Sequence, residues 1–308
     1  MESRPPVLAV CYDSRIPHCN RLLVCLFCLL SVSAGAQSPA LNISGVLEWD
    51  TMEISAQVSL ELKPLGLTLP TGRTQAEELI AAEYLALMRP LILSIPVDSS
   101  SVVGDHIAEG AFSLREAETY ALSARAGSPA MSADMTRMRA SYTISLRGLS
   151  AGFIRQSRPF DPPRALAARP VTAYTGILII AVGELPLHGT NRRARTLPCL
   201  FPKIWDSAMT LIYDKTMLES RETVMVHYAS EGSIFQETPS GLSQELRALV
   251  GDRPLRILAR EVYGIRPTDL VIDTEDALSI TSGAENRELL RQGKVVIVLD
   301  EDLLKTEF

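Results

Sequence analysis

The C-terminal run from Arg256 to Asp300 constrains the fold most, because nearly every element boundary in it carries a local signal. We expect a half-buried strand over 256–262, a short strand over 269–273, two short helices, and a strand over 294–299. The last strand, KVVIVL, contains four consecutive β-branched residues, which favour a central position covered on both faces. Because these local signals agree with one another, they indicate a folded α/β unit, although they specify no reaction.

The two helices in this run have recognisable ends. Asp273 or Thr274 is expected to cap the first helix by accepting from its free N–H groups. Ser282 and Glu285 match the capping box of the second helix, and Gly293 predicts its end.

The remaining mature chain shows a mixture of strand and helix patterns, and we expect an α+β fold with helices packed on one face of its sheets. The expected elements are a hairpin of strands 45–50 and 53–62, a helix from residue 71 with Leu79, Ile80, Leu87 and Met88 buried and a kink or end at Pro90, a helix over 114–125 capped by Ser113 and Glu116, a strand over 137–149, a central strand over 173–182, a surface loop over 183–197 holding Arg192, Arg193 and Arg195, a strand over 209–214 and a helix over 242–250.

Length and composition limit the classes of protein. The 308 residues allow one large or two ordinary domains. The formal charge of −6 and the lack of a Lys/Arg block argue against nucleic acid as a partner. Aromatic residues make up 6% of the chain, too few for a stacking platform for sugars or single-stranded nucleic acid to be the first expectation.

The N-terminus has the pattern of a secretory signal peptide. Arg15 and Arg21 precede an apolar run from Leu22 to Val32, which is too short to span a bilayer stably. We therefore expect cleavage of residues 1–36 and export to the periplasm, either free or associated with the outer membrane.

The expected cleavage site follows Ala34 and Ala36, an A-x-A pattern that ends immediately before Gln37. Of the five cysteines only Cys199 lies downstream of it, so the mature chain cannot form an internal disulfide and relies on its core. Lipidation of an upstream cysteine is the alternative to simple cleavage. Cys199 itself, between Pro198 and Leu200, is expected to be a packed thiol.

Four parts of the chain follow from these patterns. They are a signal peptide (1–36), an N-terminal α+β region (37–160), a Pro-rich linker (161–170) and a C-terminal α/β module (171–308). The sequence leaves open whether the two folded parts pack as one domain, and it does not give the oligomeric state.

Basic residues and one acid–imidazole pair are the first candidates for chemistry. Arg147 and Arg155, with Arg158, form a modest basic cluster that is either a solvated face or a site for a small anion. Asp105 and His106 could serve a hydrolase, although the neighbouring Ser-rich segment favours a pair that simply faces solvent.

Acidic residues near the C-terminus could bind a divalent cation, but their position at helix starts explains them by capping. We expect no metal and no cofactor, because the chain has no metal-ligand spacing, phosphate loop or nucleophile elbow. The acidic set is Asp269, Asp273, Glu275, Asp276, Asp300, Glu301 and Asp302.

Two blocks, Thr175–Asp214 (TGILIIAVGELPLHG…LPCLFPKIWDSAMTLIYD) and Thr268–Asp300, resemble a group of exported bacterial envelope proteins. The group is related to the flagellar assembly protein FlgT and to small outer-membrane lipoproteins, and is found mostly in spirochaetes. Ala181 stands where the pattern usually has an acid, and Cys199 where it has alanine. The resemblance implies an envelope location and a non-enzymatic role near flagella or the outer membrane.

The leading hypothesis is thus a non-enzymatic assembly or scaffold protein whose partners are other envelope or flagellar proteins, with peripheral outer-membrane association as one form of attachment. The alternative is a periplasmic ligand-binding module that holds a small anionic solute near Arg147 and Arg155. A third hypothesis is a hydrolase that uses Asp105 and His106.

Overall fold

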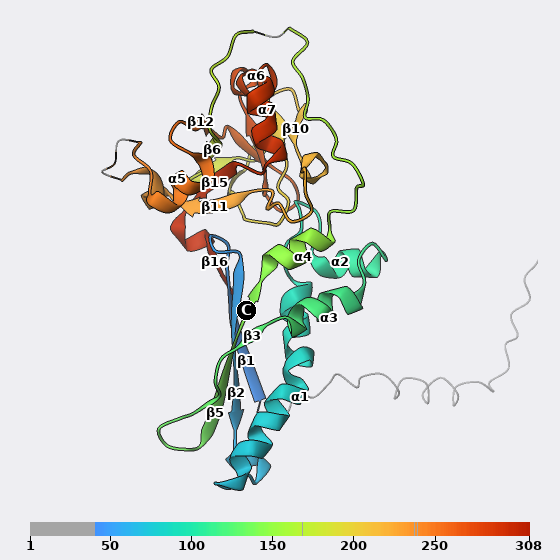
Figure 1. The fold of residues 1–308 in the computed structure, drawn as a ribbon, viewed down its shortest axis with the longest axis vertical. Helices are drawn as coiled ribbons and strands as arrows, with labels where there is room; N and C mark the ends of the chain where they lie inside the picture. The colour runs from blue at the N-terminus through green and yellow to red at the C-terminus, as the bar shows by residue number, and fades with distance from the viewer. Residues whose placement is uncertain (1–40, 168, 237, 239) are drawn as a thin grey trace, which may run out of the picture. The chain divides into compact units, whose positions relative to one another are not determined.

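Two sheet-based modules make up the part of the chain that the computed structural model describes, which is residues 41–308 except 168, 237 and 239 (Figure 1). We call them the N-terminal module (41–160) and the C-terminal module (171–308). The expected α+β fold is confirmed. The signal peptide (1–36), with its cleavage residues Ala34, Ala36 and Gln37, lies outside the described residues.

An antiparallel sheet forms the frame of the N-terminal module, and the long helix α1 (Thr71–Leu93) packs against one of its faces. Alternation along the second strand explains this, because Ile54, Ala56, Val58 and Leu60 are buried while the residues between them face outward. The expected hairpin is confirmed. In spatial order the strands are β16 (Lys305–Glu307), β1 (Leu41–Glu48), β2 (Glu53–Glu61), β5 (Arg137–Ser145) and β3 (Arg125–Ala126), with β4 (Ala130–Met131) also paired to β5.

Helix α1 was expected to kink or end at Pro90, and it does not end there. It continues to Leu93, where Leu91 and Ile92 in its last turn are buried and their packing compensates for the missing N–H. Leu79 was expected to be buried, but it is 40% exposed, and Tyr84 lies on the buried side instead.

Three short helices complete the N-terminal module: α2 (Val103–Ala108), α3 (Leu114–Leu122) and α4 (Leu146–Gly152). The predicted capping box of α3 is confirmed, since Ser113 Oγ accepts from the Glu116 N–H at 3.1 Å and Glu116 accepts from the Ser113 N–H at 2.9 Å. The strand expected over 137–149 ends at Ser145, because α4 begins there and buries Leu149 on a helical face.

A four-stranded parallel sheet forms the centre of the C-terminal module. Its strand order is β11 (His227–Ser230), β15 (Val295–Leu299), β6 (Ile177–Ile180) and β12 (Leu255–Leu258). All five residues of β15 are buried, so its predicted central position is confirmed. Helix α5 (Gln244–Val250) covers one face through Leu246 and Val250.

A second sheet, with the order β10 (Leu211–Tyr213), β9 (Ile204–Asp206), β14 (Asp269–Ile272) and β13 (Glu261–Tyr263), lies in the same module. The single strand expected over 256–262 is wrong, because it is divided between the two sheets. The Ala259 N–H still bonds to β6, whereas the Arg260 N–H bonds to Val271 of β14. The alternation of buried and exposed residues continues across this change, so the sequence pattern could not reveal it.

Helices α6 (Thr274–Thr281) and α7 (Ala284–Arg291) follow the expected positions with different caps. Asp273 occupies the N-cap position of α6, but its side chain makes no capping bond and pairs with Arg260. Gly283, and not Ser282, precedes α7. The expected surface loop over 183–197 contains the hairpin β7 (Glu184–Pro186) and β8 (Arg193–Arg195), and four 3₁₀ turns lie at Lys63–Leu65, Lys215–Met217, Glu231–Ile234 and Glu301–Leu303.

The last strand ties the C-terminal end of the chain to the first module. β16 pairs with β1, the Trp49 N–H donates to Leu304 O at 2.9 Å, and the Phe308 N–H donates to Gly45 O at 2.9 Å. Residues Ala40–Phe308 accordingly form one compact unit.

Candidate functional site

Main-chain and side-chain hydrogen bonds connect the two modules at a joint. A loop of the N-terminal module, residues 96–101, lies along the C-terminal module. The Leu200 N–H donates to Pro96 O at 3.1 Å, and the Phe201 N–H donates to Val97 O at 2.9 Å. The Arg266 N–H donates to Ser99 O at 2.9 Å. Three main-chain bonds, two from adjacent residues and one from Arg266, therefore hold this loop in place.

Asp269 is the buried carboxylate of the joint and is 1% exposed. It accepts from the Ser99 hydroxyl at 3.1 Å and from the Lys203 N–H at 3.1 Å, with the Trp205 indole N–H at 3.4 Å. Burial raises the pKa of Asp269, although these hydrogen bonds act in the opposite direction. A carboxylate buried this deeply needs such donors, so Asp269 joins groups from both modules.

Asp98 belongs to the 96–101 loop and holds the loop together by hydrogen bonds within it. Its Oδ1 accepts from the N–H and hydroxyl groups of Ser100 and Ser101 at 2.8 to 2.9 Å. Burial acts to raise the pKa of Asp98, but these four hydrogen bonds outweigh it and hold the pKa below its ordinary value.

This network also bears on the hypothesis of a hydrolase. The Ser101 Oγ lies 2.8 Å from Asp98 Oδ1 and 2.9 Å from His106 Nε2, and the tautomer of His106 decides which atom donates in the second bond. Asp105 instead accepts from the Val102 N–H at 2.8 Å and caps α2, so Asp105 and His106 bond to different partners.

An aromatic cluster surrounds a partly buried lysine at the joint. Lys215 Nζ lies 5.0 Å from the ring centroid of Phe201 and 6.0 Å from that of Phe153. Burial lowers the pKa of Lys215, while the charges of Asp98 and Asp214 oppose this. Because Phe153 and Phe201 come from different modules, the lysine and the two rings add apolar and cation–π contact across the joint.

The predicted anion residues lie near the joint but apart from each other. Arg155 lines an open hollow of about 610 Å³ together with Tyr120, Arg221, Glu116 and Glu222, and its guanidinium is 3.5 Å from the Glu116 carboxylate. The charged side chains that line this hollow are therefore two arginines and two glutamates.

Arg147 does not line this hollow. It lies close enough to His227 to add to the effect of burial, which lowers the pKa of His227 to about 4. The structure thus separates Arg147 from Arg155, and it adds Arg221, which comes from the other module and was not predicted.

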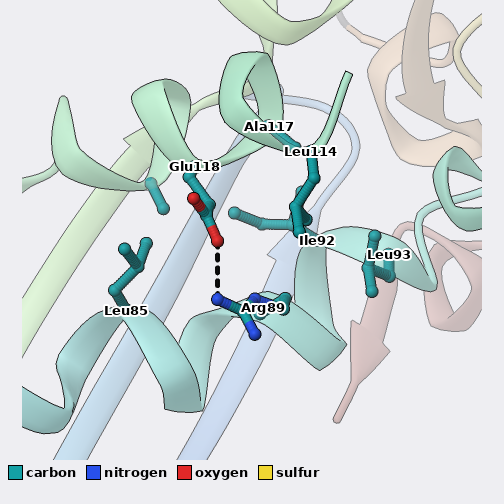
Figure 2. A pocket seen from close by; sticks show the side chains of 8 residues that line it. Leu85, Arg89, Ile92, Leu93, Leu114, Ala117 and Glu118 are labelled. Atoms are coloured by element: carbon teal, nitrogen blue, oxygen red, sulfur yellow. Dashed lines mark hydrogen bonds and ion pairs between the residues drawn. The ribbon is translucent and has the colours of Figure 1, made fainter. Parts of the chain in front are cut away.

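A small apolar crevice lies between α1 and α3 (Figure 2). The Arg89–Glu118 ion pair, at 2.6 Å, crosses it. Its volume of about 10 Å³ is room for about one water molecule, so it holds no organic ligand. It is lined by Leu85, Arg89, Ile92, Leu93, Leu114, Ala117, Glu118 and Ala121.

A histidine–carboxylate pair was missed at the sequence level. His188 Nδ1 lies 2.5 Å from Glu261 Oε2, and the His188 ring lies edge-on to Tyr263 at 5.9 Å. The two residues are 73 positions apart and meet because the His188 N–H bonds to Val262 O, so no local pattern could have identified them. The pair is an imidazole oriented by a carboxylate, about one third exposed on each side.

Cys199 is fully buried, as expected for a packed thiol, and burial raises its pKa to about 12. The acidic residues are dispersed among partners: Asp273 pairs with Arg260, and Asp302 pairs with Arg195 at 2.6 Å. Within residues 41–308, the three gaps aside, no group of three His, Cys, Asp or Glu side chains is placed to hold a metal ion. No helix in the same part of the chain is both long and apolar enough to cross a membrane.

Both modules match family models of one spirochaete protein. Residues 40–151 match Treponema pallidum Tp0624, N-terminal domain, and residues 176–301 match Treponema pallidum Tp0624, second domain. The expected spirochaete resemblance of the C-terminal part is thus confirmed, and the match of the N-terminal module was not anticipated. These matches include neither FlgT nor lipoproteins, and no curated protein matches the chain.

Proposed function

We propose that this chain, both modules of which are similar to domains of Tp0624, is an exported, non-enzymatic assembly component of a bacterial cell envelope. The signal-peptide pattern of residues 1–36 supports export to the periplasm. Its partners are other envelope or flagellar proteins, and its site of action is the flagellar base or the inner face of the outer membrane. A relation to FlgT and to small outer-membrane lipoproteins is the finer part of this proposal.

The observation that carries the proposal is the double attachment between the modules. Domains joined by a linker alone move relative to each other, and a binding protein that closes around a solute needs such a hinge. Here β16 pairs with β1, and the 96–101 loop bonds to residues near 200 and 266. A hinge motion would break main-chain hydrogen bonds at both places, so the unit behaves as a rigid body suited to holding partners at fixed positions.

The test is to extract native cells with a mild detergent and to ask which structures sediment with the protein. We expect it to accompany flagellar basal bodies or outer-membrane assemblies. The matched control is a strain of the same organism that lacks basal bodies. If the partner is flagellar, the protein should no longer sediment in extracts of that strain. Recovery of the whole protein as a free periplasmic monomer would exclude the assembly role.

A second candidate function is the binding of a small anion in the hollow beside Arg155. The observation in its favour is that Arg155 and Arg221 reach this hollow from different modules and share it with Tyr120. A ligand that binds only the folded state raises its stability, by about 2.7 kcal/mol at one hundred times Kd. We therefore expect inorganic phosphate or sulfate to raise Tm.

Arg155→Gln together with Arg221→Gln should abolish that rise in Tm. Arg139→Gln, which removes an exposed arginine from the open face of β5, is the matched control and should keep it. An equal increase in all three proteins would mean that the anions act through general salt effects and that the hollow binds nothing.

A further inference from the structure

The hollow beside Arg155 carries a balanced set of charges. Each module contributes one arginine and one glutamate to its lining: Arg155 and Glu116 come from the N-terminal module, and Arg221 and Glu222 come from the C-terminal module. A simple anion would be attracted by the two arginines and repelled by the two carboxylates. A ligand that carries one positive and one negative group would instead find a partner of opposite charge at each end. The charges of the hollow therefore match a zwitterion better than a simple anion.

Arg221 and Glu222 supply charges that are free to contact a ligand. Both residues are exposed, and within the described residues neither side chain forms an ion pair or a hydrogen bond. The main chain before them is anchored, because the Glu219 N–H donates to Arg291 O at 3.0 Å. The fold thus holds a free cation and a free anion next to each other at the hollow.

The charges of the N-terminal module are held in a different way. Glu116 Oε2 accepts from the Ser113 hydroxyl at 2.7 Å and from the Ser113 N–H at 2.9 Å, and these bonds hold the pKa of this carboxyl below its ordinary value. The Arg155 guanidinium lies 3.5 Å from the same oxygen, farther than the about 2.7–2.9 Å of a strong charge-assisted hydrogen bond. Glu116 therefore keeps Arg155 at the hollow without occupying its N–H groups fully.

Tyr120 adds a neutral hydrogen-bond donor to the lining. A Cβ at Gly152 would lie 2.8 Å from the Phe112 ring and 3.0 Å from Tyr120 Oη, so the absence of a side chain at Gly152 leaves room for the hydroxyl. Burial raises the pKa of Tyr120, and the charge of Glu116 adds to this effect. The phenol thus stays protonated at neutral pH and can donate to a carboxylate.

We propose that this hollow binds a short peptide with free ends in its zwitterionic form. Arg155, Arg221 and Tyr120 bind the carboxylate of the peptide, and Glu222 binds its ammonium group. The volume of about 610 Å³ lies in the range of sites for small organic ligands, so it suits a peptide of two or three residues better than an inorganic ion. The inference rests on the second candidate function, ligand binding in this hollow, and narrows the class of ligand.

The first test measures binding of three ligands to the exported, processed protein at pH 6.5 by titration calorimetry. Dialanine carries both charges at this pH, N-acetyl-dialanine only the negative one, and dialanine amide only the positive one. We expect dialanine to bind, and each blocked form to bind at least about tenfold more weakly, because each lacks one charged contact.

The results separate this inference from the second candidate function. If N-acetyl-dialanine binds as tightly as dialanine, then the hollow binds anions and the zwitterion proposal is wrong. The same holds if none of the three ligands binds while phosphate raises Tm through the two arginines. If neither dialanine nor phosphate binds, both proposals fail.

The second test assigns the two ends of the peptide to side chains. Glu222→Gln should weaken dialanine at least about tenfold and should not weaken N-acetyl-dialanine, because only the ammonium group loses its partner. Arg221→Gln should weaken both ligands. Glu78→Gln is the matched control, since Glu78 is an exposed glutamate of α1 that does not line the hollow. Equal affinity of Glu222→Gln and Glu78→Gln for dialanine would overturn the proposal.

Discussion

The hydroxyl of Ser99 donates to the buried carboxylate of Asp269 at 3.1 Å, across 170 positions of sequence and across the joint between the modules. The same carboxylate accepts from the main chain at Lys203. One buried acid thus links the 96–101 loop of the first module to the central strands of the second. The stability of the joint should depend on this residue more than on any exposed ion pair.

Asp269→Ala is expected to destabilise the protein by about 3 kcal/mol, because four donors lose their acceptor at once: the partly buried groups of Ser99, Lys203 and Trp205 and the buried hydroxyl of Thr268. Asp269→Asn keeps the shape and one acceptor oxygen, and we expect a loss of about 1 to 2 kcal/mol. The measurement is the free energy of unfolding in urea.

The matched control for Asp269 is Asp302→Asn, which removes a carboxylate that is 67% exposed and paired with Arg195. An exposed pair contributes at most about 1 kcal/mol, so this variant should stay close to the parent. If Asp269→Ala unfolds at the same urea concentration as Asp302→Asn, then Asp269 does not hold the joint together.

Capping residues and hydrophobic patterns in the sequence correctly predicted the elements that depend mainly on contacts between residues close in sequence. The capping box of α3 and the buried strand β15 needed only short-range chemistry and hydrophobic pattern, and both are confirmed. Helix α1 continues past Pro90 because burial of Leu91 and Ile92 outweighs the preference of proline, and this burial depends on the sheet beneath. The division of 256–262 between two sheets was likewise decided by strand partners far away in sequence.

The residues of the candidate site were harder to predict from the sequence than the elements of the fold. Arg155 was identified, but its partner in the hollow, Arg221, comes from the other module, and Arg147 was grouped with Arg155 only because they are near in sequence. The bonds of Asp269 to Ser99 and of His188 to Glu261 join residues 170 and 73 positions apart. Pairs of this kind depend on how modules and hairpins dock, and a single sequence carries no trace of that.

His227 should make stability depend on pH. Burial first, and then the charge of Arg147, lowers its pKa from 6.5 to about 4. Between these values the unfolded chain binds a proton at His227 that the folded chain does not. Stability therefore falls as the pH is lowered from about 6.5 to about 4, by roughly 2 to 3 kcal/mol for this group.

The contribution of His227 is isolated by comparing urea unfolding at pH 7 and pH 4.5 in the parent and in His227→Gln. The variant should lose less stability between the two pH values, whatever its stability at pH 7. An unchanged pH dependence in His227→Gln would show that other groups are responsible.

Alanine substitutions at Gly293 and Gly189 distinguish the cost of backbone strain from the cost of steric overlap. Both have positive φ, at +65° and +73°, where an L-residue costs about 1 kcal/mol. A Cβ at Gly293 would lie 2.2 Å from the carbonyl oxygen of Val224, whereas a Cβ at Gly189 meets nothing within 4 Å. Gly189→Ala should cost about 1 kcal/mol and Gly293→Ala at least about 2 kcal/mol more, in urea unfolding. Equal losses would mean that the start of β15 shifts freely away from Val224.

Cys199 should react only when the protein unfolds. Its thiol is fully buried, and burial raises its pKa to about 12, so both access and the thiolate fraction are low at neutral pH. Iodoacetamide at pH 8 should therefore leave the peptide that contains Cys199 unmodified in the native protein and modify it fully in guanidinium chloride, as measured by mass spectrometry. Cys199 lies next to Leu200, whose N–H bonds to Pro96 O at the joint. If native Asp269→Ala is labelled much faster than the native parent protein, then the opening that exposes Cys199 occurs at the joint. Rapid native labelling in the parent protein would contradict the buried position of this thiol.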